Sequence, residues 1–509
     1  MAVIRRAIER AAQHATARTQ SARGVSPAPS LGLDLIRPAT DIGPRHAVRL
    51  VNFTARHGRV QSRPGLVVHA DVAGENKAIE TIREHGSRLY AASADTIWEV
   101  AASPVARVES LTAGRFQTAR LADRMIWVNG VDAPRLVDSA GAWTEGNWNP
   151  ETVPVARFRT VTTHRGRLYF TVAGSPVIWY GGAGEISGTL TSVDLSLVYS
   201  GGACVGIGSL SIAGSAGPDD LAVFFMADGT ALLYRGSYPG SDDWTIVGRY
   251  PLPPLVSDRP LIPWGGDLVA LTREGYTSIR QYLDAGDVPT DHSQRALSAR
   301  ISPLVQDAVA EMGTWDPVRW PDQGLLIVST SDGSQHVLDI QSGAWSVWSG
   351  WDVRSWGLLG DGSLLVGLLG GRIGRVTFGV DDFGEPFSAS ARSGWDYLGS
   401  AYDKHFRALR PHVELQGGSA SLRVSVDTDY DTRNRASRQV SIRGSGPQWG
   451  EAEWGEAEWG AGQVLTSSWR RLSRVGAAVS LGVDVEINGS QGVAWLETDL
   501  LYNQTSGIS

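Results

Sequence analysis

Short β-rich runs of apolar residues recur along the chain from about residue 88, and each is followed by a turn and a second run. This pattern predicts antiparallel hairpins. The dipeptides Asp228-Gly229 and Asp332-Gly333 fit the turns, because primed hairpin turns need residues that accept positive φ. The hairpin units that we identify begin at Arg88, Arg124, Arg167, Leu221, Asp267, Leu325 and Ser363.

The spacing of the units predicts how they are arranged. Their starts are on average about 46 residues apart, within the range of about 40 to 50 residues that is typical of propeller blades. A β-solenoid needs shorter coils, and a sandwich does not sustain seven similar hairpins. We therefore expect a mainly-β chain with a β-propeller of about six or seven blades over residues 46–382.

One segment of this region has helical periodicity instead. Residues 284–313 carry apolar side chains three or four positions apart, and Ser302-Pro303 has the residues of a helix start, with Ser as N-cap and Pro at the first position. We expect a helical insertion between two blades. Its apolar positions are Leu297, Ile301, Leu304, Val305, Ala308, Val309 and Met312.

The two ends of the chain differ from the hairpin series. After about residue 382 the alternating runs are longer, and turn residues stand at Gly417-Gly418 and Asn488-Gly489, so residues 383–509 predict an antiparallel β-sandwich domain. At the other end, an Ala- and Arg-rich start favours a helix until Ser26 breaks the pattern. We expect a short helix and a flexible arm over residues 1–45.

Composition and charge exclude several classes of protein. The net charge of −7 argues against a general nucleic-acid coat, because tight phosphate binding uses clustered cations. The single cysteine, Cys204, allows no intrachain disulfide, which favours a protein assembled inside the cell over a secreted one. No apolar run approaches the ~20 residues of a membrane helix, and the N-terminus lacks the apolar stretch of a signal peptide.

The usual motifs of catalysis and metal binding are absent from the sequence: it has no phosphate-binding glycine loop, no closely spaced cysteine pair, no HExxH and no GxSxG. His405 and His412 are seven residues apart, which on a regular strand places them on opposite faces. Asp427, Asp429 and Asp431 have the spacing that opens calcium loops, but no glycine follows, so a solvated strand face is the better interpretation. We expect no catalytic residue, no cofactor and no metal site.

Two other functions remain open at this stage. Propellers often carry glycosidases, and with 53 carboxylates in the chain a catalytic acid pair is not excluded, although Ser331-Asp332-Gly333 lacks the aromatic residue that should follow it in a sialidase motif. Trp-Asp dipeptides at Trp315, Trp351 and Trp395 are typical of scaffold propellers. Those repeats also need an upstream Gly-His, which this chain does not have.

The segment QWGEAEWGEAEWG, residues 448–460, places tryptophan at a strict period of five. This period turns 500° on a helix and alternates faces on a strand, so neither element gathers the three indoles, and we expect an irregular loop within the C-terminal domain. The indoles either clasp their own domain or reach another chain, with the glutamates at the rim. The candidate interaction residues are Trp449, Trp454, Trp459, Glu451, Glu453, Glu456 and Glu458.

Three features together resemble the tail nozzle family of tailed bacteriophages, which includes tail tubular protein B and the head-stabilisation hub proteins. The resemblance covers the chain from about residue 45. It is carried by the helical insertion over residues 297–309, by the repeated WGEAE unit, and by an opening of the form Asn-x(n)-Gly-x(n)-Arg-Pro-Gly at Asn52, Gly58, Arg63, Pro64 and Gly65. The Arg-rich start departs from the usual short N-terminus of the family.

The resemblance implies a structural virion protein and no catalysis. Such proteins form a homo-oligomeric ring, commonly a hexamer, that contacts the portal or adaptor and other tail proteins. The ring seals the channel and then conducts double-stranded genomic DNA during ejection, without sequence-specific binding. The localisation implied is the virion, after assembly in the host cytoplasm. Large anchor residues suit ring assembly, although for any single one of the 19 tryptophans burial in the core is the more usual role. The alternatives are a propeller depolymerase and a cytosolic propeller scaffold with peptide partners.

Overall fold

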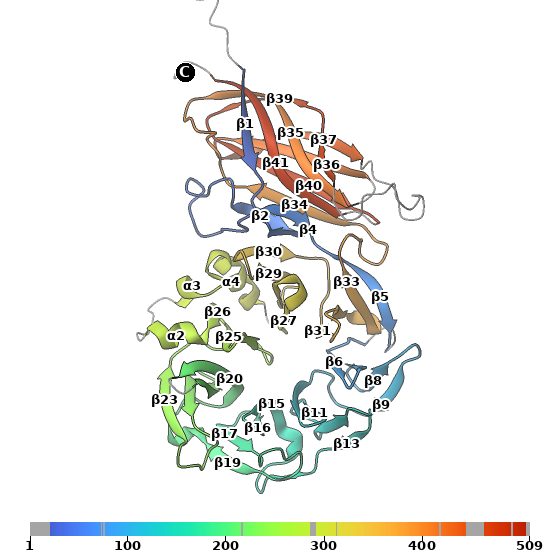
Figure 1. Cartoon of the computed structure of the whole chain (residues 1–509), viewed down its shortest axis with the longest axis vertical. Coiled ribbons are helices and arrows are strands. Elements are labelled where there is room, and N and C mark those ends of the chain that lie inside the picture. Colours follow the sequence, from blue (N-terminus) through green and yellow to red (C-terminus); the bar gives the residue numbers. More distant parts are fainter. Residues whose placement is uncertain are drawn as a thin grey trace, which may run out of the picture. The chain divides into compact units, whose positions relative to one another are not determined.

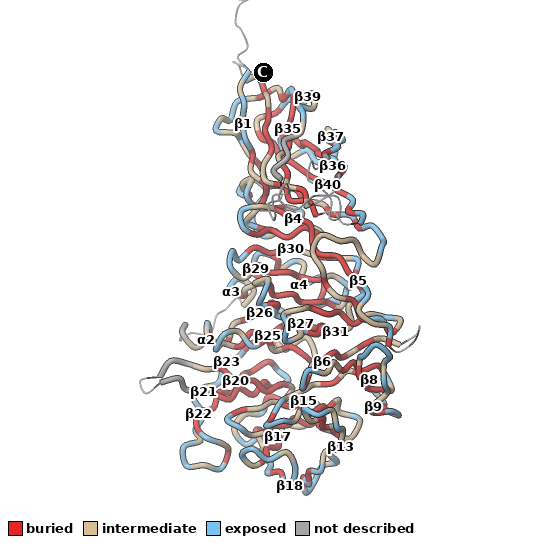
Figure 2. The backbone as a smooth tube through the Cα atoms, turned by 45° about the vertical axis from the view of Figure 1, so that its right-hand side comes forward, coloured by how far each residue is buried: buried red, intermediate tan, exposed pale blue. Residues whose placement is uncertain are grey.

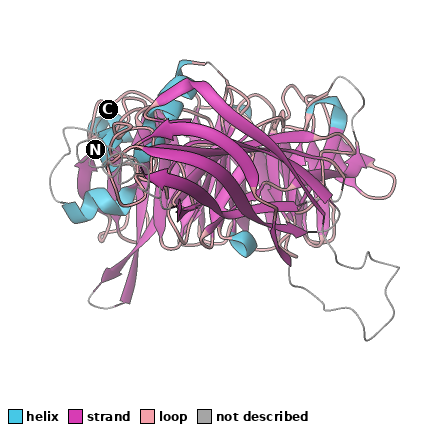
Figure 3. Cartoon of the chain, turned by 90° about the horizontal axis from the view of Figure 1, so that it is seen from above, coloured by secondary structure: helices cyan, strands magenta, loops and turns pink. Residues whose placement is uncertain are grey.

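The computed structural model describes residues 21–504 except 73, 75–76, 215–216, 286–291, 312, 417–418, 444–462 and 490–491. Within these residues the chain is mainly β, which confirms the sequence prediction at that level, and the helices are few and short (Figure 3). Strands carry most of the buried residues in Figure 2, whereas exposed residues gather in the connections.

The chain divides into two compact units. Unit 1 comprises Met1–Arg63 and Gly379–Ser509, and unit 2 comprises Pro64–Phe378. Unit 2 is therefore inserted into unit 1, since the chain leaves unit 1 after Arg63 and returns to it at Gly379. Residues 46–63, which the sequence grouped with the hairpin series, pair instead with strands from the C-terminal part of the chain.

The described part of unit 2 contains seven successive sets of antiparallel strands, called here the first to seventh sheets. The first three are β6 (Thr81–His85), β7 (Arg88–Ala92), β8 (Ile97–Val100) and β9 (Val105–Val108); β10 (Gln117–Leu121), β11 (Arg124–Val128), β12 (Arg135–Asp138) and β13 (Trp143–Glu145); and β15 (Phe158–His164), β16 (Arg167–Val172), β17 (Val177–Tyr180) and β19 (Thr191–Asp194). The next two are β20 (Cys204–Gly214), β21 (Gly217–Met226), β22 (Ala231–Arg235) and β23 (Thr245–Tyr250); and β24 (Leu261–Trp264), β25 (Asp267–Thr272) and β26 (Gly275–Ser278). The last two are β27 (Asp316–Trp320), β28 (Leu325–Ser329), β29 (Gln335–Asp339) and β30 (Ala344–Trp348); and β31 (Ser355–Leu358), β32 (Leu364–Gly367), β33 (Arg372–Thr377) and β5 (Gly65–Asp71). The short strands β14 (Trp148–Asn149) and β18 (Gly188–Thr189) pair separately.

The hairpins predicted from the sequence are the second and third strands of each sheet. The units that begin at Arg88, Arg124 and Arg167, for example, coincide with the starts of β7, β11 and β16. The hairpin predictions are therefore confirmed. The sequence did not indicate the first strands. It also did not indicate that β5, from the start of unit 2, pairs with β33 at its end.

The first strands of consecutive sheets lie side by side. β15 contacts β10 and β20, β24 contacts β20 and β27, and β31 contacts both β27 and β6. Side-chain hydrogen bonds join β6 to the next sheet, from Arg83 Nε to Thr118 Oγ1 (3.0 Å) and from Thr81 Oγ1 to the Gly114 carbonyl (2.8 Å). In Figure 1 the sheets follow one another around unit 2 in the order of the sequence colours.

Apolar clusters fill the spaces between neighbouring sheets. Between the first and second sheets, Tyr90, Ile97, Phe116 and Trp127 are almost fully buried. Similar clusters join the second to the third sheet, the third to the fourth, the fourth to the fifth, and the seventh to the first. Burying one large apolar side chain contributes about 1.5 to 3 kcal/mol, so these clusters are the main stabilising contribution to unit 2.

Short helices connect β26 to β27, which confirms the predicted helical insertion. They are α2 (Ile279–Ala285), α3 (His292–Arg295), η3 (Ala299–Ile301) and α4 (Ser302–Ala310). Val305 and Ala308 form the buried side of α4. The helix begins at Ser302 itself, so Ser302 does not act as the predicted N-cap. The other 3₁₀ turns are η1 (Val155–Arg157), η2 (Leu195–Leu197), η4 (Pro321–Gln323) and η5 (Leu369–Gly371).

The described part of unit 1 contains two antiparallel sheets, each with a buried apolar face. One comprises β3 (Phe53–Arg56), β4 (Arg59–Ser62), β41 (Gly492–Gln504), β35 (Lys404–Gln416), β38 (Gln463–Thr466), β1 (Ser21–Pro27) and β39 (Arg470–Gly476). The other comprises β2 (Ala47–Val51), β34 (Phe387–Ser393), β40 (Val479–Ile487), β36 (Ser419–Thr428) and β37 (Asp431–Arg443).

The N-terminal arm differs from its prediction. Residues 21–27 form β1, which pairs with β41 along its whole length. Arg23 of β1 also donates to both carboxylate oxygens of Asp499, at 2.8 to 3.1 Å. These long-range bonds order a segment that has no local strand pattern. The predicted helix over the first residues lies outside the described residues.

Candidate functional site

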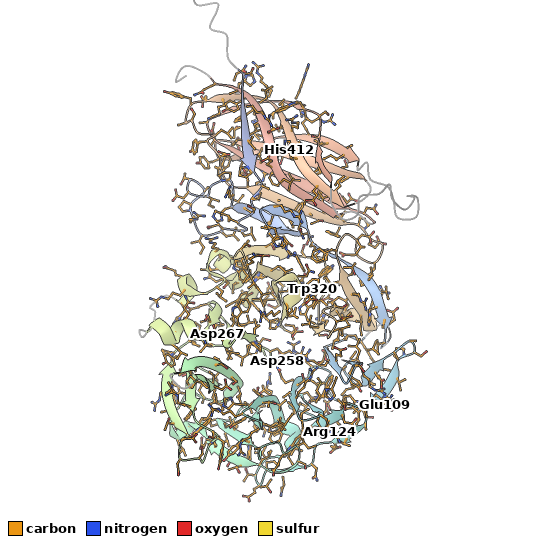
Figure 4. All side chains as sticks on the ribbon, viewed as in Figure 1. Glu109, Arg124, Asp258, Asp267, Trp320 and His412 are labelled. Atoms are coloured by element: carbon orange, nitrogen blue, oxygen red, sulfur yellow. The ribbon has the colours of Figure 1, made fainter. Side chains whose placement is uncertain are left out.

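Charged side chains gather where the chain enters the first strands of several sheets of unit 2. Arg115 stands just before β10, Asp258 and Arg259 stand just before β24, and Asp316 begins β27. Figure 4 places Asp258 toward the middle of unit 2, among the sheets. Residues far apart in sequence meet here, as in the bond from Arg115 to the Trp315 carbonyl, which joins residues 200 positions apart.

Arg259 links four sheets. Its Nη1 lies 3.2 and 3.3 Å from the carboxylate oxygens of Asp316, and its Nη2 donates to Thr81 Oγ1 (2.6 Å) and to the Phe116 carbonyl (2.7 Å). Both Arg259 and Asp316 are 6% exposed. A buried pair of this kind is costly to break, since the remaining charge then has no partner.

Arg115 makes a second ion pair beside the first. Its Nε donates to both oxygens of Asp258 (2.7 and 2.8 Å), and its Nη2 donates to the Trp315 carbonyl (2.6 Å). Burial raises the pKa of the Asp258 carboxyl, but the charges of Arg115 and Arg259 outweigh this effect and leave the pKa lowered. Asp258 is therefore an ionised partner of arginine, with no tendency to hold a proton.

A cavity of about 380 Å³ opens beside these pairs. Five of the seven first strands line it: β6, β10, β24, β27 and β31. Arg83, Arg120 and Arg319 face it together with Glu84 and Asp316. Burial, followed by the nearby charge of Arg259, lowers the pKa of Arg83 to about 10.

The resolved pKa shifts of the described carboxyl groups all have the same direction. A glycosidase needs one carboxyl group whose pKa is raised, so that it can donate a proton at neutral pH. Each described Asp or Glu that departs clearly from its ordinary pKa departs downwards. The central ion pairs are better suited to holding strands together.

A second polar cluster lies in unit 1, where the chain leaves it and returns. Arg63 donates from Nε to Asn52 Oδ1 (3.0 Å) and from its two Nη atoms to Asp382 (2.9 and 2.6 Å), and its guanidinium carbon lies 3.8 Å from the ring centre of Phe387. Asn52, at φ 56°, donates to the Ser388 carbonyl (2.8 Å). The structure therefore brings together the Asn and Arg of the opening motif, which the hairpin of β3 and β4 separates.

The remaining motif residues are explained by the same hairpin. Gly58 has φ 76° in the turn between β3 and β4, where a residue with a Cβ would be strained. Pro64 and Gly65 lead directly into β5. The opening motif is thus the segment by which the chain passes from unit 1 to unit 2.

The seven candidate interaction residues of the sequence, from Trp449 to Trp459 with the intervening glutamates, lie outside the described residues. Most other tryptophans are core residues, including the three of the Trp-Asp dipeptides, which are 7% exposed or less. Trp469 is an exception at 37% exposed, and the guanidinium carbon of Arg410 lies 4.7 Å from its ring centre.

Two predictions about polar residues of unit 1 are wrong. Asp427 does not lie on a solvated face: its side chain is fully buried and pairs with Arg392 and Arg435. His405 and His412 do not lie on opposite faces, because a β-bulge between Phe406 and Ala408 shifts the alternation of β35. They still have separate partners, Ser473 and Asp499.

The described residues are also informative about metal ions and membranes. No group of three or more His, Cys, Asp or Glu residues in this part of the chain could hold a metal ion. No helix in it combines the length and the apolar character that crossing a membrane requires.

Comparison with known proteins gives no family for this chain: neither a protein-family model nor a curated protein matches it. The resemblance noted in the sequence rests on the chain's own residues.

The sequence did not identify the central charged residues. These are Arg83, Arg115, Asp258, Arg259 and Asp316. A local signal was present for two of them, because Arg259-Pro260 and Asp316-Pro317 place a charge directly before a proline at the start of a first strand. A residue before proline is held extended, which fits a strand entry. The pairing of these charges has no local signal, since the partners are 57 residues apart.

Proposed function

We propose that this chain is a structural virion protein of a tailed phage. Copies of it form a ring, the nozzle or hub of the head-to-tail channel, which seals the channel and then conducts double-stranded DNA during ejection. In this proposal unit 2 is a seven-bladed β-propeller and unit 1 a β-sandwich. The ring contacts the portal or adaptor and other tail proteins, and its commonest form in the family is a hexamer.

The strand order supports the propeller. Its seven sheets would be the blades, and the contacting first strands would surround the axis. The pairing of β5 with β33 would hold the ring of blades closed, because it joins the first strand of the unit to its last sheet. In addition, β31 of the seventh sheet contacts β6 of the first.

The observation that carries the family proposal is the cluster of Asn52, Arg63 and Asp382. If the residues of the motif did not contact one another, the resemblance to the phage family would have no structural basis. Arg63 is instead fully buried, and its guanidinium binds both the motif asparagine and the segment by which the chain returns to unit 1. The motif therefore has one structural purpose, to fix both crossings between the units.

The centre of unit 2 supports assembly from several copies. The major groove of DNA is already about 12 Å wide, so the duplex needs a broad passage. Arg259 and Arg115 make hydrogen bonds to other sheets in the middle of unit 2, and these bonds argue against such a passage through the described part of unit 2. DNA would have to pass through a lumen that several copies enclose.

Detection in particles and measurement of mass test this proposal. Mass photometry of the purified 54.5 kDa chain should show a single oligomer, at a multiple of that mass. Mass spectrometry of purified virions should find the chain in fixed proportion to the portal protein. A protein that stays monomeric and is absent from particles would contradict the proposal.

The use of the Trp-rich segment in this ring is decided by one variant. Replacing Trp449, Trp454 and Trp459 together by alanine would leave a folded monomer if these indoles contact a neighbouring copy. Loss of folding would show that they clasp their own unit. Circular dichroism and mass photometry of the same sample distinguish the two uses.

A further inference from the structure

The wall of the cavity in unit 2 combines charged and apolar residues. Its volume is about 380 Å³, within the range of small-molecule sites. Two acids and three arginines face it. The apolar part of the wall comprises Ile82, Leu261, Ile262, Val318, Trp356 and Leu358.

Both acids of the wall already have partners. Asp316 is paired with Arg259 and accepts a hydrogen bond from the Trp356 amide at 2.9 Å. Glu84 Oε2 accepts from the Gly360 amide at 2.5 Å. Neither carboxylate forms an ion pair with an arginine of the cavity wall within the described residues.

The three arginines have neutral partners only, so far as the described residues extend. Arg83 donates from Nε to Thr118 Oγ1 (3.0 Å) and from Nη1 to the carbonyls of Ile82 (2.7 Å) and Trp356 (3.2 Å). A guanidinium has five donors, and no described group accepts from Nη2 of Arg83.

The other two arginines have fewer bonds. Arg120 donates to the Glu84 carbonyl, and Arg319 lies with its guanidinium carbon 5.6 Å from the ring centre of Trp264. Both are exposed, so their side chains are available to a molecule in the cavity.

We propose that this cavity binds a small organic carboxylate, whose oxygens take the free donors of Arg83 and the charge of Arg319 while its apolar body lies against Leu261, Ile262 and Val318. A planar guanidinium matches the two oxygens of a carboxylate. The wall carries one more cation than anion, which suits a single negative charge better than the nearly double charge of a phosphate ester. This inference is independent of the proposed ring.

Titration calorimetry of the full-length protein tests the site with hexanoate as the probe. We expect hexanoate to bind, and hexanamide, which has the same shape without the charge, to bind at least about tenfold more weakly. The variants Arg83→Gln and Arg319→Gln should each weaken hexanoate by a similar factor. The matched control is Arg249→Gln on β23, an exposed arginine outside the cavity wall, which should leave binding unchanged.

Three further results would overturn the proposal. The first is that hexanoate does not bind at millimolar concentration, and the second is that hexanoate and hexanamide bind equally well. The third is that inorganic phosphate or a DNA duplex binds more strongly than hexanoate and depends on the same arginines. Circular dichroism shows whether each variant is folded. If Arg83→Gln does not fold, the exposed Arg319→Gln decides the outcome.

Discussion

Arg259 binds groups of three other sheets in the centre of unit 2. It pairs with Asp316 in a nearly water-free position and also binds groups of two other sheets. Two charges buried together give modest net stability, but one buried charge alone is strongly unfavourable. The same reasoning applies to Arg63 and Asp382 in unit 1, where the arginine side chain has no exposed surface.

Replacing Arg259 by methionine should destabilise the protein by about 3 to 5 kcal/mol, because the buried Asp316 loses its ion-pair partner. Urea unfolding followed by tryptophan fluorescence measures this change. Arg249→Met, on an exposed position of β23, should change stability by less than about 0.5 kcal/mol. If the two variants lost similar amounts of unfolding free energy, the central ion pair would contribute no more to stability than an exposed arginine.

Two buried histidines predict how stability depends on pH. Burial lowers the pKa of His164 and His336 from the ordinary 6.5 to about 4. The unfolded chain therefore takes up protons below pH 6.5 that the folded chain refuses until about pH 4. The contribution to stability is complete above pH 6.5 and is lost as the pH falls through this window, by about 2 kcal/mol for each histidine at pH 5.

Urea unfolding at pH 7, 6 and 5 tests this expectation. His336→Gln should reduce the loss of stability at pH 5 by about 2 kcal/mol. The lowered carboxyl pKa values, such as that of Asp499, have their effect near pH 4 and below, so they do not obscure the result. An unchanged slope in the variant would contradict the assignment.

The polar partners could not be predicted from the sequence. Asp427 was expected in solvent because three aspartates alternate in sequence, yet Arg392 and Arg435 bury it. His405 and His412 were predicted on opposite faces because an odd number of positions separates them, and a single β-bulge reverses this relation. Long-range pairing and bulges leave no local pattern, whereas the burial of most tryptophans follows from their size and was expected.

At the scale of elements, a close backbone approach joins β31 to β6. A Cβ added at Gly357 would meet the Ile82 side chain at 2.3 Å, which is far inside the normal contact distance. Glycine at this position allows the first strands of the seventh and first sheets to lie side by side.

Replacing Gly357 by alanine should therefore cost about 1 to 3 kcal/mol, since the added methyl group forces the two strands apart. Gly43→Ala is a suitable control, because a Cβ there meets nothing within 4 Å. Thermal unfolding followed by circular dichroism compares the two variants. Equal melting temperatures would show that β31 and β6 do not lie in contact.

The elements that could be predicted are those with a local apolar pattern. The second strands β28 and β21 contain long apolar runs, from Leu325 to Val328 and from Leu221 to Met226, and the turns that follow them carry Asp-Gly. Some first strands, such as β6 and β10, mix charged and apolar residues, so they have no clear apolar pattern. β1 is a strand only because β41 pairs with it.

For the whole molecule, the insertion of unit 2 into unit 1 is the feature that the sequence did not reveal. The chain crosses between the units twice, after Arg63 and before Gly379. The 315 residues of unit 2 lie between the two crossings. The buried Arg63, bound to Asn52 and Asp382, holds both crossings in unit 1. The opening motif looked like a family signature, and its structural purpose is this junction.

Replacing Arg63 by alanine should destabilise unit 1 by about 3 to 5 kcal/mol, because Asp382 loses its partner and Phe387 loses the guanidinium that covers it. Hydrogen exchange measured by mass spectrometry should show faster exchange in β3, β4 and β34 than in the strands of unit 2. Uniform exchange across both units would contradict a role confined to the junction.

The central claim is that several copies of this chain enclose a passage for DNA. Single-particle electron microscopy of the purified full-length protein tests it most directly. The account predicts closed rings with a lumen that admits a DNA duplex and with the middle of each unit 2 filled by side chains. Isolated monomers, or rings whose lumen is too narrow for the duplex, would contradict it.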